Sequence, residues 1–296
     1  MPEEIPVHEP PRRSAGVLRR LLRDRMVLVG GSLVLIMVLG AVFAPLLSPA
    51  DPLAQQTSNR VKPPFWETGN IHHPLGTDPV GRDVLSRVLY GSRISLMLGI
   101  VAVLVSGTIG TLLGLLAGYY ERQFGELVMR LADVQLSFPV ILLAISVVAV
   151  VGRSLPALVA VLAISGWVVY ARTVRGSVLS LREKEFIEAA RALGCGGFRI
   201  VLRHILPNCI APLLVIATVQ MATMIILESG LSFFGLGTQP PTPSWGGMLA
   251  EGREYLIAGA WWLTTFPGLA ISITVLGINL LGDGLRDVLD PQLQNS

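Results

Sequence analysis

The chain has 296 residues, of which 52% are hydrophobic and 15% are charged. A mean hydropathy of +0.63 is too high for a soluble fold of this length, so we expect an all-α, polytopic membrane protein. The net charge of +3 could suggest a nucleic-acid partner. The basic residues instead cluster before the first apolar stretch and after the fourth, as they do on the cytoplasmic side of membrane proteins, so no nucleic-acid partner is predicted.

Six uncharged stretches can each supply the ~20 residues that a membrane-spanning helix needs, and they predict six transmembrane helices. The stretches are Met26–Ala50, Ile94–Tyr120, Val134–Gly152, Ser154–Ala171, Ile205–Leu227 and Leu256–Gly282. The basic clusters predict a multi-pass protein of the plasma (inner) membrane with both termini in the cytoplasm. A seventh uncharged stretch, Ser229–Ala250, holds so many glycines and prolines that we expect a loop outside the membrane core.

The predicted organisation, in chain order, is a cytoplasmic tail at 1–25, a first transmembrane helix at 26–47, an external loop at 48–93, a five-helix core at 94–283 that includes a cytoplasmic loop at 172–208, and a cytoplasmic tail at 284–296. Within the external loop, apolar and polar residues fall on opposite helical faces from Gly81 onward. This pattern predicts a short helix that lies on the outer membrane surface.

Three features of the predicted core bear on its mechanism. Pro139 lies inside the third span and should bend it, because proline removes a helical hydrogen bond. The second span carries glycines that allow close helix packing in lipid. Glu228 and Asp283 lie at the ends of spans five and six, and we interpret them as caps or boundary anchors rather than as sites for a coupling ion.

The segment Glu185–Asn208, between spans four and five, is the most informative part of the chain. It predicts a helix ending near Gly194, a turn at Gly196 and Gly197, and a second helix stopped by Pro207. The first helix is small and partly apolar, which suits docking into the groove of a partner protein. From composition alone, an amphipathic helix lying on the inner leaflet is an equal alternative.

The same segment resembles the EAA loop of binding-protein-dependent ABC importer permeases of type I. The matching residues are Glu188, Ala189, Ala190, Gly194, His204, Leu206 and Pro207. In that family the helix seats in a cleft of the ATPase subunit and transmits its closure to the membrane helices. The resemblance implies four partners besides membrane lipid: a second homologous permease, two ATP-binding subunits that hold ATP and magnesium, and a solute-binding protein.

Two further regions resemble the dipeptide, oligopeptide and nickel permease group, most of all the C-type permease of dipeptide importers. They are Leu75–Leu96, and Gly230–Leu249 together with the tail Gly282–Leu293. The resemblance implies import of short peptides, dipeptides first, with nickel or glutathione as alternatives. We expect the binding protein to contact residues of the external stretches: Gly76, Thr77, Asp78, Gly81, Arg82, Asp83, Gln239 and Trp245.

Enzymatic activity is not predicted for this chain. The phosphate-binding pattern G-x-x-x-x-G-K-[ST] is absent, so ATP hydrolysis is assigned to separate subunits. No histidine lies within a predicted span, and the adjacent pair His72 and His73 has no metal-ligand spacing, so neither a catalytic site nor a metal or cofactor site is predicted. A passive channel remains the alternative class, but a channel would not need the docking loop.

Overall fold

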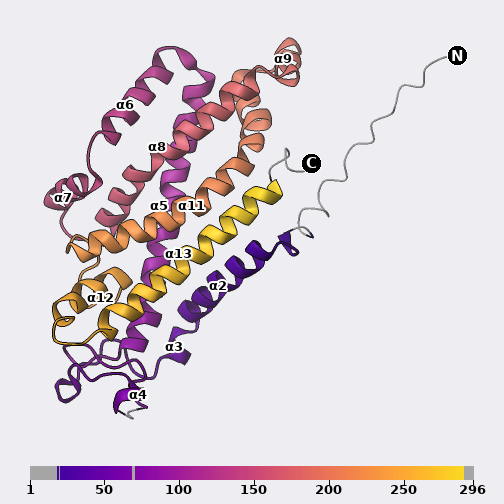
Figure 1. The fold of residues 1–296 in the computed structure, drawn as a ribbon. Coiled ribbons are helices and arrows are strands. Elements are labelled where there is room, and N and C mark those ends of the chain that lie inside the picture. Colours follow the sequence, from indigo (N-terminus) through magenta and orange to yellow (C-terminus); the bar gives the residue numbers. More distant parts are fainter. Residues whose placement is uncertain (1–18, 20, 69–70, 290–296) are drawn as a thin grey trace.

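The computed structural model describes residues 19, 21–68 and 71–289, so most of the predicted tail at 1–25 and the last residues of the tail at 284–296 lie outside it. The described residues form an elongated bundle of long helices (Figure 1). This part of the chain contains no strand, only an isolated bridge between Thr77 and Asp83. The all-α prediction is therefore confirmed.

Five helices of the described chain are long and apolar enough to cross a membrane. They are α2 (Arg25–Val42), α5 (Val84–Tyr119), α8 (Leu155–Arg182), α13 (Trp262–Leu289) and α11 (Leu206–Phe233), the last of which continues α10 (Gly197–Ile200) and the π-helical turn η3 (Val201–Ile205). A sixth span is reached when α6 (Glu126–Leu136) and α7 (Val140–Val151) are counted as one broken span.

The break between α6 and α7 is much sharper than the predicted bend, because the two helices meet at 94°. Helix α6 ends at its C-cap Ser137, and Pro139 is the N-cap of α7. Proline disfavours helical backbone at the residue before it and supplies no N–H of its own. The prediction of one bent helix is thus wrong in detail, since Phe138 and Pro139 interrupt the helix completely.

The predicted surface helix after Gly81 is also wrong, because these residues are the first turns of α5, which runs unbroken to Tyr119. Asp83 caps α5, and its carboxylate accepts a hydrogen bond from the Ser86 N–H at 2.7 Å. The charged residues that interrupted the apolar pattern find partners inside the protein. Arg93 donates to the Ala41 carbonyl at 2.5 Å, and Arg87 is buried in ion pairs.

Other boundaries shift because helices extend beyond the uncharged stretches. Helix α8 continues to Arg182, which shortens the predicted loop 172–208. Helix α13 begins only at Trp262 and enters the predicted tail at 284–296. The predicted loop Ser229–Ala250 contains the last turn of α11 and most of the short helix α12 (Trp245–Gly252).

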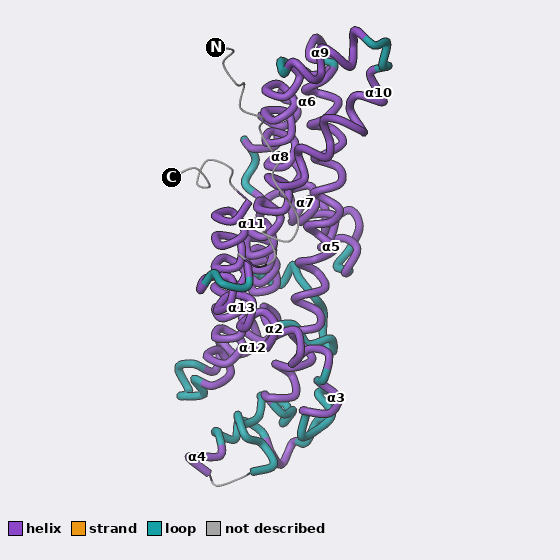
Figure 2. The backbone as a smooth tube through the Cα atoms, turned by 90° about the vertical axis from the view of Figure 1, so that its right-hand side faces the viewer, coloured by secondary structure: helices purple, strands orange, loops and turns teal. Residues whose placement is uncertain are grey.

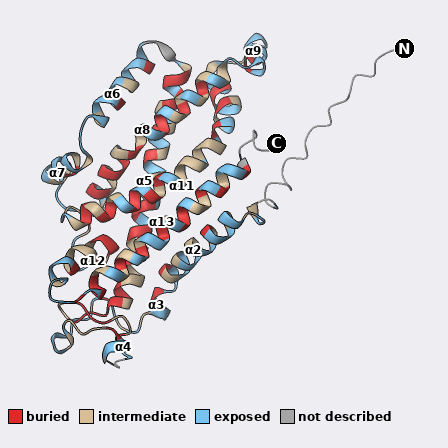
Figure 3. Ribbon diagram, viewed as in Figure 1, coloured by how far each residue is buried: buried red, intermediate tan, exposed pale blue. Residues whose placement is uncertain are grey.

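Helices α5 and α8 form the most extensive contact of the bundle. A row of glycines on α5 faces α8, and a Cβ atom added at Gly110 would lie 2.3 Å from the Trp167 carbonyl oxygen. The helices therefore approach as closely as backbone atoms allow, the packing that small residues permit in lipid. Figure 3 shows buried residues concentrated along α5 and α8, whereas α2 and α7 are mainly exposed.

The two ends of the bundle differ in structure. The α9 end carries α9 (Glu185–Ala192) and the turn η2 (Glu121–Gly125). The α12 end carries α12 and most of the loop structure (Figure 2), including α3 (Ala44–Leu47), η1 (Thr57–Asn59), α4 (Phe65–Thr68) and η4 (Arg253–Tyr255). Both ends hold residues that the sequence singles out.

Candidate functional site

Helix α9 is anchored to the bundle through one face. Ile187 is fully buried and Ala190 is buried beside it. Both belong to an apolar cluster with residues of α5, α8, α10, η3 and α11: Leu115, Val174, Val178, Ile200, Val201, Ile205 and Cys209. Because interiors are closely packed, a displacement of α9 is passed directly to the ends of three long helices.

The opposite face of α9 and the turn after it are open. Glu188 and Ala189 are exposed, and so are three large apolar side chains of the same segment. Phe186 is 46% exposed, Leu193 85% and Phe198 75%. A cluster of exposed apolar side chains of this kind marks a surface for a partner protein. We call these five residues the α9 face.

Gly194 ends α9 in the geometry that the sequence predicts. Its φ of +81° is the left-handed conformation that favours glycine. The Cys195 N–H donates to the Ala190 carbonyl at 3.0 Å, and the Gly194 N–H donates to the Arg191 carbonyl at 2.9 Å. These two bonds form a Schellman motif. No atom lies within 4 Å of a Cβ added at Gly194, so backbone conformation, and not space, requires glycine here.

The predicted stop at Pro207 is wrong, because the helix continues through it into α11. The π-helical turn η3 precedes the proline, and the Leu206 N–H bonds to the Val201 carbonyl five residues earlier. This altered register, which often appears at functional positions, places the proline in the first turn of α11, where its missing N–H is tolerated. His204 is half-buried, and its carbonyl accepts from the Asn208 side chain at 2.6 Å.

At the α12 end, two arginines and two carboxylates form a compact network. Asp78 Oδ2 accepts from Arg82 Nε at 2.5 Å and from Arg87 Nη1 at 2.6 Å. Glu251 Oε2 accepts from the same two arginines at 2.9 and 2.6 Å. The side chains of Asp78, Arg82 and Arg87 are almost fully buried. The network joins the loop before α5, the first turn of α5 and helix α12.

The residues expected to contact a binding protein mostly lie inside this structure. Of the predicted set, the buried members are Gly76, Thr77, Asp78, Gly81, Arg82, Asp83 and Trp245, and only Gln239 is exposed. Gly76 and Gly81 have φ values of +83° and +84°. The Thr77 carbonyl accepts from Trp262 Nε1 at 3.2 Å, and Trp245 Nε1 donates to the Val88 carbonyl at 3.0 Å. In this structure the buried side chains stabilise the α12 end, and their contact with a binding protein stays a prediction.

His73 also has a local role. Its Nδ1 lies 3.1 Å from Asp83 Oδ1, and its Nε2 lies 3.3 Å from the Asn59 side-chain nitrogen. In the part of the chain that the structure describes, no three His, Cys, Asp or Glu residues are grouped so that they could hold a metal ion. Both ring nitrogens of His73 are thus engaged in holding the loop before α5.

Glu228, near the C-terminal end of α11, is buried inside the bundle. Its side chain is fully buried and connects α5 to α11. Ser232 Oγ donates to its carboxyl at 2.7 Å, Ser95 Oγ at 3.4 Å and Ser229 Oγ at 3.5 Å. The Ser95 hydroxyl also accepts from the Trp245 N–H at 3.3 Å. Glu228 is therefore part of a polar contact between α5, α11 and the start of α12.

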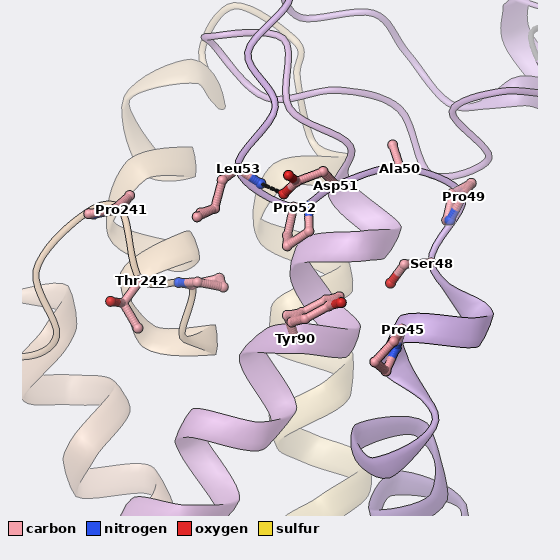
Figure 4. A pocket seen from close by; sticks show the side chains of 11 residues that line it. Pro45, Ser48, Pro49, Ala50, Asp51, Pro52, Leu53, Tyr90, Pro241 and Thr242 are labelled. Atoms are coloured by element: carbon pink, nitrogen blue, oxygen red, sulfur yellow. Dashed lines mark hydrogen bonds between the residues drawn. The ribbon is translucent and has the colours of Figure 1, made fainter.

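The accessible feature of the α12 end is a cavity of about 700 Å³, lined by Pro45, Ser48–Leu53, Tyr90 and Pro241–Pro243 (Figure 4). Figure 4 shows the loop 48–53 on one side, the segment around Thr242 on the other, and Tyr90 of α5 between them. The Asp51 carboxylate accepts from the Leu53 N–H at 2.8 Å, which fixes the loop. Gln239, the exposed member of the predicted contact set, precedes Pro241 of this cavity by two residues.

Comparison with known proteins assigns the chain to a family. Residues 110–295 match the family described as binding-protein-dependent transport system inner membrane component, which covers more than half of the chain. Residues 14–64 match the N-terminal transmembrane domain of oligopeptide transport permease C. The chain belongs to the family of binding-protein-dependent permeases. It is the permease subunit of an ABC importer in the inner membrane.

Curated relatives of this permease align over nearly their full length. The di/tripeptide transport permease DppC of Pseudomonas aeruginosa is 45% identical over 90% of this chain and 89% of its own. The dipeptide permease DppC of Alkalihalophilus pseudofirmus is 44% identical over 94% and 89%. The glutathione permease GsiD of Pectobacterium atrosepticum is 44% identical over 94% and 90%.

A solved structure shares the permease fold. The inward-facing MetNI methionine ABC transporter superposes with a TM-score of 0.55 at 23% identity, over 68% of this chain and 95% of that chain. The α9 residues named above lie within the part of the chain that matches the family. The ion-pair network joins Glu251, inside the matched range 110–295, to Asp78, Arg82 and Arg87, which lie between the two matched ranges.

Sequence reasoning missed Glu251 and Arg87 as functional partners in this permease. Glu251 lies in a short run of charged residues with Arg253 and Glu254 after a glycine-rich stretch, and Arg87 looks like an exposed residue of an amphipathic helix. The sequence gives one signal of this network: acidic and basic residues alternate closely between Asp78 and Arg87, which indicates ion pairs among them. The pairing with Glu251, 164 residues along the chain, is visible only in the fold.

Proposed function

We propose that this permease pairs with a second, related permease, two ATP-binding subunits and a solute-binding protein, and that the assembly imports short peptides, dipeptides first. ATP and magnesium are held by the ATP-binding subunits, and this chain provides the path and the coupling element. The observation that carries the coupling assignment is the α9 face, an exposed apolar surface rigidly connected to α5, α8 and α11.

The proposed orientation puts the α9 end and both termini in the cytoplasm. Basic residues gather in the C-terminal part of α8 and in the segment after it: Arg172, Arg175, Arg182, Lys184, Arg191, Arg199 and Arg203. Excess Lys and Arg near the ends of membrane helices favour the cytoplasmic side. The α12 end, with its cavity and the exposed Gln239, then faces the solute-binding protein, and we propose this cavity rim as the surface that the binding protein contacts.

Coupling follows from the packing of α9. ATP binding closes the partner ATPase pair and moves the α9 face with it. Because Ile187 and Ala190 belong to the same cluster as residues of α5, α8 and α11, the movement reorients these helices as a unit. The bundle then opens toward the binding protein, and hydrolysis returns it to the inward-facing state.

Gly194 offers the sharpest test of this coupling. Replacing it by valine should abolish uptake, because a β-branched residue is strained at a φ of +81° and the α9 face would be displaced. Insertion of the chain into the membrane should stay normal. The measurement is peptide uptake by cells in which the variant replaces the parent chain, together with the amount of permease in isolated membranes.

The matched control is Gly194→Asn, since asparagine tolerates the left-handed conformation better than other side chains and no atom lies close to the new Cβ. This variant should keep most of the uptake. Normal uptake with Gly194→Val would remove the docking assignment, and equal loss in both variants would show that bulk, not conformation, matters at this turn.

The proposed cargo is tested by uptake into cells that lack this chain. The names of the relatives support peptides first and glutathione second. We expect loss of labelled dipeptide uptake and its recovery when the chain is restored. Labelled glutathione and nickel serve as parallel cargoes, and loss of either of these alone would keep the importer architecture and overturn the peptide assignment.

A further inference from the structure

A second cavity, of about 140 Å³, lies where the α7–α8 turn meets the α11–α12 loop. These elements lie on the same side of the bundle in Figure 1. The polar residues of its wall are Arg87, Arg153, Ser232, Thr238, Gln239, Thr242, Ser244 and Glu251. We call this cavity the Arg153 pocket. It is distinct from the proline-lined cavity of Figure 4, with which it shares only Thr242.

Of the described charged side chains in and next to the Arg153 pocket, all but Arg153 are paired with an opposite charge. Arg82 and Arg87 are neutralised by Asp78 and Glu251 through the ion pairs described above. Arg153 is exposed, and it forms no hydrogen bond or ion pair with any other residue that the structure describes. The pocket therefore presents one uncompensated guanidinium group to whatever enters it.

Arg87, another residue of the wall, is paired through its terminal nitrogens but has one unpaired nitrogen. Arg87 is 3% exposed, and its Nε is buried without a hydrogen-bond acceptor in the described structure. Buried polar atoms are rarely left unpaired, and such an exception indicates a role or an absent partner. The wall also holds the hydroxyls of Thr238 and Ser244, which bond to each other, and the Gln239 side-chain amide, which donates to the Gly237 carbonyl. The unpaired guanidinium of Arg153 in this polar wall favours a small anion.

The volume limits what that anion can be. A cavity of about 140 Å³ cannot enclose a whole peptide, since sites for small molecules usually measure about 300–1,000 Å³, but it accommodates a carboxylate group. Guanidinium groups pair with carboxylates through parallel hydrogen bonds, which gives both affinity and orientation. Every peptide cargo with a free C-terminus carries one such group.

We propose that the Arg153 pocket receives the C-terminal carboxylate of the imported peptide, with Arg153 as its charge partner. This inference rests on the proposed peptide cargo and deepens it, because it places a cargo subsite in the permease in addition to the one in the binding protein. Arg153 directly precedes Ser154, the N-cap of α8, so the positive end of that helix dipole lies close by and reinforces the preference for an anion.

The test uses a reporter thiol in the pocket wall. Ala250 lines the pocket, and Ala250→Cys introduces a thiol whose reaction with a maleimide is followed by peptide mapping, so that the native Cys195 and Cys209 do not interfere. The complete transporter in membrane vesicles is labelled with and without dialanine, and with dialanine amide, which lacks the carboxylate. Dipeptide uptake by the same vesicles is measured in parallel.

We expect dialanine to slow the labelling and its amide to do so only weakly. Adding Arg153→Gln should raise the dialanine concentration needed for half-protection about 10- to 100-fold, the range for loss of a charged hydrogen bond. The matched control is Arg253→Gln, which removes a surface arginine at the same end that stacks on Phe233. This change should leave protection unaltered.

The possible failures are distinguishable. Two results would overturn the pocket assignment and leave the cargo assignment standing, provided that the vesicles take up dipeptide. Either dialanine does not slow the labelling, or it slows the labelling equally in the Arg153→Gln variant and in the parent. Equal protection by dialanine and its amide would likewise overturn it. If the vesicles with the parent chain take up no dipeptide, the cargo assignment itself fails.

Discussion

Replacing Asp78 by alanine is expected to lower the stability of this permease by about 3–5 kcal/mol, the range for breaking a buried ion pair by removing one partner. Asp78 is almost fully buried and accepts from Arg82 Nε and Arg87 Nη1. Its other oxygen accepts from the N–H groups of Val80 and Arg82, each at 2.9 Å. Loss of the carboxylate leaves two buried guanidinium groups with Glu251 as their common partner.

The measurement is the thermal unfolding temperature of the purified transporter that contains the variant. Asp51→Ala is the matched control, because Asp51 is an exposed aspartate at the same end of the bundle whose carboxylate has one local bond, to the Leu53 N–H. Substitutions of exposed residues of this kind usually change the free energy of unfolding by no more than about 0.5 kcal/mol. An unfolding temperature for Asp78→Ala equal to that of the control would mean that the network does not stabilise the α12 end.

The same network shows where sequence patterns were insufficient. A motif rich in Asp and Arg next to an apolar stretch predicts an exposed loop and a surface helix, because isolated charges belong in water. In the fold, Asp78, Arg82 and Arg87 neutralise one another together with Glu251, so the motif is buried and α5 begins at Val84. The decisive partner is distant in sequence, and no local pattern indicates it.

Local stereochemistry was predictable where a single residue decides it. Glycine at 194 predicts a left-handed helix end, and the structure has that geometry with both hydrogen bonds of the motif. Proline was less decisive. Pro139 breaks its span completely, whereas Pro207 is accommodated within a continuous helix because a π-helical turn precedes it. The outcome at a proline depends on the hydrogen-bond register of the preceding turn, which the sequence does not specify.

Glycines in the spans predict close packing but do not identify the position at which it is closest. Gly110 of α5 and Gly176 of α8 both lie within long helices of the same helix pair. A Cβ at Gly110 would lie 2.3 Å from the Trp167 carbonyl oxygen and 2.6 Å from the Tyr170 Cβ, whereas none of the surrounding atoms lies within 4 Å of a Cβ at Gly176. The two positions should therefore respond in opposite directions to one added methyl group.

Gly110→Ala is expected to destabilise the permease by about 1–3 kcal/mol, the usual range for overpacking, because backbone atoms of α8 obstruct the methyl group and the two helices have to separate. Gly176→Ala should be neutral or stabilising by up to about 1 kcal/mol, since alanine is the better helix former and meets no obstacle. Thermal unfolding of the two variant transporters measures both values.

An equal rise of the unfolding temperature in the two variants would show that α5 and α8 lie farther apart than the structure places them. A lowered unfolding temperature for Gly110→Ala alone would instead confirm the backbone contact. Because α8 leads directly into α9, separation of α5 from α8 should also reduce peptide uptake, so Gly110→Ala links the packing of the bundle to the coupling at its α9 end.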